Sequence, residues 1–118
     1  MNIEDIQKIC TRFAGVTQDI KWENHLCFNV GGKMFMITSP ETVPVSASFK
    51  TGSEMFEQLS VRPGCQPAPY LARYNWVHVD DLTRFTKKEW ENLLAEAYKL
   101  VYEKLPAKTR ALIGNKKS

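Results

Sequence analysis

Residues 25–38 read HLCFNVGGKMFMIT, two alternating segments joined by a pair of glycines. Tandem glycines favour a two-residue hairpin turn, because glycine readily adopts the positive φ angles that such a turn needs. A tight turn at Gly31 and Gly32 also sets the register of the two strands. The predicted pairs are Val30 with Lys33, Phe28 with Phe35, and Leu26 with Ile37. Five of these six residues are apolar, so they form the predicted core face. The opposite, open face would carry His25, Cys27, Asn29, Met34, Met36 and Thr38.

Before the hairpin, the helical spacing of apolar residues predicts an amphipathic helix over residues 3–14, with Asn2 as its N-cap and Gly15 ending it in a left-handed turn. A third strand is predicted over residues 43–50, where apolar and polar residues alternate. The segment TGSE at residues 51–54 resembles a capping box and predicts a short helix to about residue 60. A last strand is predicted over residues 74–80.

The C-terminal third is dominated by one long predicted helix. TKKE at residues 86–89 is a second capping box, and a wide apolar stripe follows to about Lys104, before Pro106 stops the helix. Residues 107–113 are predicted to add a helical turn. The complete order is α-β-β-β-α-β(β)-α. Short turns cannot join parallel strands, so we expect an α+β fold with a mainly antiparallel sheet and helices packed on one face.

Length and composition predict one domain over residues 1–118, with residues from about 105 to 118 as a basic C-terminal extension. The net charge of +3 is mild for a dedicated nucleic-acid binder. The three cysteines are far apart and form no CxxC pair, which predicts reduced thiols. The N-terminus lacks a signal-peptide pattern and no apolar run could span a bilayer, so the predicted location is cytoplasmic, without membrane association.

No motif in the chain indicates catalysis. His25 and His78 are the only histidines, and neither has the neighbours in sequence that a metal site or a nucleophile would need. Asp80 and Asp81 are adjacent, and the preferred role for this pair is capping the next turn. The segment Gly31-Gly32-Lys33 lacks the spacing of a phosphate-binding P-loop. We therefore expect no enzyme activity, no metal and no cofactor.

Several cations lie near aromatic residues or at the ends of predicted elements, where they could contact phosphate. These candidates are Lys33, Lys50, Arg62, Arg73, Arg84, Lys87 and Lys88. The C-terminal lysines, Lys116 and Lys117 among them, could assist. Tyr70 and Trp76 are the aromatic candidates, because the rigid proline-rich loop RPGCQPAPYL at residues 62–71 and the strand after it fix their positions. The alternative is that these cations and aromatic residues belong to an ordinary solvated surface that binds no ligand.

The hairpin FNVGGKMF at residues 28–35, the loop at residues 62–71, the WV step at Trp76 and the AYKLV segment at residues 97–101 together resemble the MmcQ/YjbR family of small bacterial proteins. The segment WEN at Trp22 agrees with this. The resemblance implies a compact α+β domain with a frataxin-like, CyaY-like layout. It also implies DNA binding through a proposed "double wing" arrangement, with Lys33, Tyr70 and Trp76 at signature positions.

Two functions from different classes therefore stay open. The first is a non-enzymatic DNA-binding or DNA-associated protein, weak and largely independent of sequence. The second is a protein-interaction or adaptor domain, with a homodimer as one variant, that uses either the open sheet face or the Tyr70 loop. Iron binding, which a frataxin-like layout suggests, is not expected, since the first helix offers only Glu4 and Asp5 beside Lys8 and Arg12.

Overall fold

The computed structural model describes residues 1–21 and 24–115. Outside the described residues lie Trp22, which is part of the family resemblance, and the C-terminal Lys116 and Lys117. The elements in chain order are α1 (Ile3–Cys10), β1 (Val16–Lys21), β2 (His25–Val30), β3 (Lys33–Ser39), β4 (Ser46–Lys50), α2 (Ser53–Ser60), β5 (Cys65–Pro67), η1 (Ala72–Tyr74), β6 (Trp76–Val79), η2 (Leu82–Arg84), α3 (Lys87–Glu103) and α4 (Ala107–Asn115). The predicted α+β class is confirmed.

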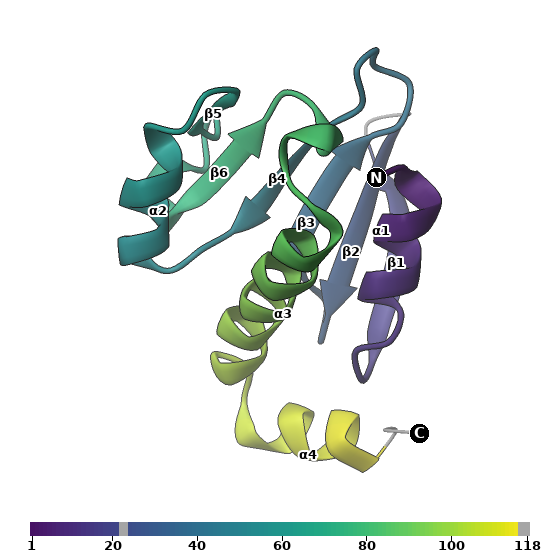
Figure 1. The fold of residues 1–118 in the computed structure, drawn as a ribbon. Helices are drawn as coiled ribbons and strands as arrows, with labels where there is room; N and C mark the ends of the chain where they lie inside the picture. The colour runs from purple at the N-terminus through teal and green to yellow at the C-terminus, as the bar shows by residue number, and fades with distance from the viewer. Residues whose placement is uncertain (22–23, 116–118) are drawn as a thin grey trace.

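A single antiparallel sheet has the order β1-β2-β3-β4-β6-β5, with α3 and α1 lying on one of its faces (Figure 1). The helix α2 packs against the β5–β6 end. Strand β1 was not predicted, because five of its six residues are exposed and it has no apolar alternation. It forms nonetheless, pairing with β2 over its whole length.

The predicted hairpin is present, but its register is wrong beyond the turn. Val30 pairs with Lys33 as expected, whereas Phe28 pairs with Met36 and Leu26 pairs with Thr38. A β-bulge between Phe28 and Asn29 causes this, because one extra residue on β3 reverses the alternation from there on. Phe35 and Met36 are consequently both fully buried.

The open face proposed for protein interaction therefore loses part of the apolar surface assigned to it. Met36 belongs to the core, and Cys27 is also completely buried. Ile37, which was predicted to face the core, is only half-buried. The bulge thus exchanges Met36 for the half-buried Ile37 on this face, and with Cys27 buried the sheet-face version of the adaptor hypothesis loses much of its apolar surface.

Aromatic rings make up much of the core between α3 and the sheet. Trp90 packs edge-on against Phe49 and Phe85, with ring centroids 5.5 and 5.1 Å away. The Trp90 indole N–H donates to the Leu82 carbonyl at 2.8 Å, which satisfies a buried donor. Farther along the helix, Tyr98 stacks on Phe13 at 4.9 Å. This packing holds α3 across β2, β3 and β4.

The boundaries of three predicted elements need correction. The helix α1 ends at Cys10, not at residue 14, because the backbone N–H groups of Arg12 and Phe13 bond three residues back, as in a tight turn. Gly15 does adopt a positive φ of 72°. The third strand begins at Ser46, and Val43 is almost fully exposed. The last strand is shorter than predicted and covers Trp76–Val79.

The two predicted capping boxes had different outcomes. The box at Thr86 and Glu89 is confirmed, with both reciprocal hydrogen bonds present. The box at residues 51–54 is wrong: α2 has Gly52 as its N-cap and no side-chain cap. The Thr51 hydroxyl instead donates to the Asn75 carbonyl at 2.6 Å, so Thr51 ties β4 to the loop before β6.

The segment after α3 turns across the end of the sheet (Figure 1). Leu105 and Ile113 are both buried, and they pack against the two glycine turns at Gly31 and Gly15. A Cβ at Gly31 would lie 2.6 Å from Leu105 Cδ1, so this glycine serves both the left-handed turn and the close approach. In the described parts of the chain, no helix has the length and apolar character to cross a membrane.

Candidate anion-binding cleft

A cleft of about 340 Å³ lies at the end of the sheet where β3 and β6 begin, β4 ends, and α3 reaches its C-terminus. The lower part of Figure 1 shows the C-terminal end of α3 on this side of the molecule. The cleft residues are Lys33, Met34, Lys50, Tyr74, Trp76, Leu100, Val101, Lys104, Leu105 and Pro106. Three are lysines, and none of these described lining residues is acidic.

Each lysine is placed by the end of a different element. Lys33 follows the two-glycine turn and begins β3. Lys50 ends β4, and its ammonium group donates a hydrogen bond to the Tyr74 carbonyl. Lys104 is the C-cap of α3. Because Lys50 and Lys104 are 54 positions apart in the sequence, only the tertiary fold brings these charges together.

The lysines affect one another electrostatically. Burial lowers the pKa of Lys50, and the positive charge of Lys104 lowers it further. A like charge nearby destabilises the charged form of a lysine. An anion that binds between two such lysines relieves this repulsion, so their electrostatics favour its binding. The cleft therefore carries positive charge that its own lining does not neutralise.

The remaining walls are largely apolar. Trp76 is only 5% exposed, and Leu105 beside it is equally buried. Apolar walls with a few convergent charged groups are typical of pockets that hold a ligand with an apolar body and a charged end. The arrangement suits binding. It offers no nucleophile paired with a base among the described lining residues.

A loop between β5 and β6 borders the cleft through Tyr74. Within it, Tyr70 is 98% exposed and has a φ of 66°, a left-handed conformation that is uncommon for a residue other than glycine. Asn75 is also left-handed, with a φ of 64°. The Arg73 guanidinium carbon lies 4.8 Å from the centre of the Tyr74 ring, and so beside the cleft. One further cation candidate, Arg73, and the exposed Tyr70 ring thus belong to the same loop.

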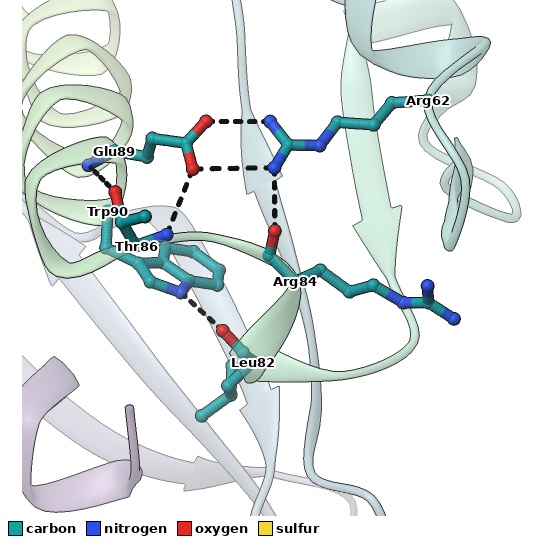
Figure 2. Close-up of polar contacts among 6 residues, drawn as sticks. All are labelled: Arg62, Leu82, Arg84, Thr86, Glu89 and Trp90. Atoms are coloured by element: carbon teal, nitrogen blue, oxygen red, sulfur yellow. Dashed lines mark hydrogen bonds and ion pairs between the residues drawn. The ribbon is translucent and has the colours of Figure 1, made fainter.

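Two predicted phosphate-binding arginines are instead held by carboxylates. Figure 2 shows Arg62 gripping Glu89, with nitrogen–oxygen distances of 2.7 and 3.4 Å, while donating to the Arg84 carbonyl at 2.7 Å. The Arg84 side chain points away from Glu89 and forms an ion pair with Asp80 at 2.9 Å. The Arg62 guanidinium thus stabilises the start of α3, whereas the Arg84 guanidinium links η2 to the end of β6.

Arg62 and Glu89 form a clamp at the start of α3, and its hydrogen bonds change the pKa of the carboxylate. Arg62 lowers the pKa of Glu89 to about 2, with help from the backbone N–H of Thr86. The Arg62 guanidinium also lies over the Phe85 ring, 4.4 Å from its centre. A carboxylate committed in this way cannot repel or attract a ligand as a free charge would.

Lys87 and Lys88 are separated from the cleft. They begin α3, whereas Lys104 follows its end, and a rise of 1.5 Å per residue puts roughly 25 Å between the two ends. That distance exceeds the Debye length of about 8 Å at physiological salt. The seven predicted cations therefore divide among separate places: Lys33 and Lys50 share the cleft with Trp76, and Arg73 lies beside it. Lys104, absent from the predicted site, completes the cleft.

One further polar pair lies on the sheet. His78 Nδ1 lies 2.9 Å from the Ser48 hydroxyl, and burial lowers the pKa of this histidine. The carboxylate of Asp80, two residues along, is engaged by Arg84.

Asp81 accepts a hydrogen bond from the Thr83 N–H, and its predicted capping role is confirmed. The described residues contain no group of three or more histidine, cysteine or acidic side chains placed to hold a metal ion.

Comparison with known proteins places this geometry in a family. A model of the YjbR family matches residues 11–100. The crystal structure of Deinococcus radiodurans protein DR2400, described with the domain DUF419, superposes with a TM-score of 0.86 at 23% identity, covering 99% of this chain and 91% of that one. A Pseudomonas syringae protein superposes with a TM-score of 0.70 at 18% identity, covering 86% of this chain and 99% of that one. Both structural matches show a shared fold.

The comparison with curated proteins finds no match to this chain. The family model, by contrast, spans the glycine hairpin, the proline-rich loop and most of α3, which are the features that carried the resemblance in the sequence. The resemblance is therefore confirmed, and the chain belongs to the YjbR family.

Proposed function

We propose that this protein binds the phosphate backbone of nucleic acid, weakly and with little regard to sequence, and that it has no catalytic activity of its own. The observation that carries the proposal is the cleft at which Lys33, Lys50 and Lys104 converge without an acidic lining residue. Phosphate contacts by lysine supply the sequence-independent part of nucleic-acid affinity. Arg73 lies next to the cleft and could extend the contact.

The size of the site limits the strength of binding. Three lysines can neutralise about three phosphates, and each neutralised phosphate contributes about −0.9 to the slope of log K against log salt for duplex DNA. We therefore expect a slope of about −2.7, with micromolar or weaker affinity at moderate salt. This is a shallow salt dependence by the standard of proteins with many phosphate contacts.

Fluorescence anisotropy with a labelled 20-base-pair duplex at several salt concentrations tests the proposal. The double variant Lys33→Gln with Lys104→Gln should weaken binding and flatten the slope by about 1.8. Lys50 is left in place, because its bond to the Tyr74 carbonyl holds the adjoining loop. The control is Lys87→Gln with Lys88→Gln, which removes the same charge at the far end of α3 and should leave the slope unchanged.

Two results would count against the proposal. One is the absence of binding at micromolar protein in low salt. The other is an equal loss of affinity in both double variants, which would mean that net charge matters and the cleft does not.

A further inference from the structure

The loop beside the cleft exposes an aromatic ring that the core does not use. Tyr70 is 98% exposed, and its backbone is held in a left-handed conformation. Non-glycine residues in this conformation carry a local energetic penalty and persist only when their surroundings hold them. Here the surroundings are backbone bonds, from the Leu71 N–H to Ala68 and from the Trp76 N–H to Leu71, at 3.1 and 3.3 Å.

The loop is also fastened to the lysine cleft. Lys50 donates to the Tyr74 carbonyl, and Thr51 binds the Asn75 carbonyl through both its backbone N–H, at 3.0 Å, and its hydroxyl. Tyr70 and Tyr74 are four positions apart in the sequence, so their Cα atoms are at most about 14 Å apart even in an extended chain. The backbone of Tyr70 is therefore held near the charged cleft, and its exposed ring projects from that position.

These features favour an unpaired strand over a duplex. In a double helix the faces of the bases are covered by their stacked neighbours, so an aromatic side chain can stack on a base only by wedging between base pairs and unstacking them. An unpaired strand can splay its bases onto aromatic rings and insert them into apolar hollows. The cleft has both parts of such a site, since lysines converge at walls formed by Trp76, Leu105 and their neighbours.

We propose that the preferred ligand of this cleft is single-stranded nucleic acid, with one base against the apolar wall, its phosphates at the lysines, and a nearby base stacked on Tyr70. This inference rests on the proposed function and adds the form of nucleic acid that the site selects. Binding of this kind combines a charged groove with stacking platforms and tolerates any base sequence.

The experiment compares three labelled probes at one salt concentration: a 20-residue oligothymidine, a 20-base-pair duplex, and an abasic 20-mer that has the phosphates without the bases. We expect the oligothymidine to bind most tightly. The variant Tyr70→Leu should weaken its binding about fivefold or more, since stacking on one base is lost. Tyr70→Phe should retain wild-type affinity, because the ring face remains.

Two controls make the result specific. Tyr70→Leu and Tyr70→Phe share the same backbone strain, so the comparison between them isolates the ring. Val61→Ala removes another apolar side chain, 85% exposed, at the C-cap of α2, and it should leave the affinity for all three probes unchanged. Circular dichroism melts of all variants should coincide, because Tyr70 does not contribute to the core.

The outcomes separate this inference from the proposed function. Equal binding of the oligothymidine, the abasic strand and the duplex, all weakened by the Lys33 and Lys104 substitutions, would overturn the single-strand preference and leave phosphate binding intact. Unchanged affinity of Tyr70→Leu for oligothymidine would also overturn it. If none of the three probes binds in low salt, both proposals fail.

Discussion

Replacing Arg62 with methionine should destabilise the protein in a way that depends on pH. In the native structure this guanidinium makes a two-point contact with Glu89 and a hydrogen bond to the Arg84 carbonyl. Methionine keeps an apolar stem to pack over Phe85 but removes the donors. The substitution therefore tests the clamp at the start of α3 more than it tests packing.

The magnitude follows from the exposure of the pair. Hydrogen bonds to charged groups contribute about 1.5–3 kcal/mol when sheltered, whereas exposed ion pairs contribute about 0–1 kcal/mol. The side chains of Arg62 and Glu89 are 34% and 39% exposed, so solvent screens the pair in part. We expect a loss of about 1–2 kcal/mol. For 118 residues, each kcal/mol lowers Tm by about 4 °C, which gives about 4–8 °C.

The pH dependence has a definite sign. The folded state lowers the pKa of Glu89 from 4.5 to about 2. A carboxyl group with a lowered folded pKa stabilises the protein above its unfolded pKa, and this contribution disappears as the pH falls through the folded value. The stability gap between wild type and Arg62→Met should therefore be full at pH 6–7 and shrink between about pH 4.5 and 2.

Urea denaturation at several pH values measures this gap. A double-mutant cycle with Glu89→Gln isolates the ionic contact, because glutamine preserves the capping box with Thr86. The control is Arg12→Met, which removes an exposed pair with Glu91 at 3.7 Å and should change stability by 0.5 kcal/mol or less. A gap that stays constant from pH 7 to pH 3, or a loss no larger than that of Arg12→Met, would refute the reasoning.

The other predictions concern a turn and the thiols. Gly31→Ala and Gly32→Ala both force alanine into a left-handed turn, but only at Gly31 would the new Cβ meet Leu105. The Gly31→Ala variant should therefore be less stable than Gly32→Ala by about 1–2 kcal/mol in urea melts. Equal losses of stability in the two variants would contradict this. Under native conditions a thiol reagent should label half-exposed Cys65 first, because Cys10 is buried and its pKa is raised to about 12; rapid native labelling of Cys10 would argue against the packing of α1.

Patterns of local sequence predicted most elements of this fold. The glycine pair at Gly31 and Gly32, the capping box at Thr86 and the stripe after it each operate within a few residues. Local chain stiffness and one-sided burial act on that same scale, so these predictions are confirmed. Strand β1 could not be predicted in this way, since it is a mostly exposed edge strand whose formation depends on β2 as a template.

The errors arose where a distant contact changed a local outcome. The bulge opposite Phe28 moved Met36 into the core and reversed the predicted face of β3. Thr51 was predicted to cap a helix, but its hydroxyl found the Asn75 carbonyl, 24 residues away. Side-chain oxygens accept or donate wherever geometry permits, and sequence spacing does not show which partner is near.

The sequence by itself determined most of the elements, the antiparallel character of the sheet and the family, because these depend on periodicity and turn chemistry between close neighbours. Only the tertiary structure decided which charges act together. It paired Arg62 with Glu89 and Arg84 with Asp80, placed Lys87 about 25 Å from the end of its helix, and brought Lys104 to Lys33 and Lys50. The energy of an electrostatic interaction depends on the distance between the charges in space. The folded structure sets that distance, and separation along the sequence does not show it.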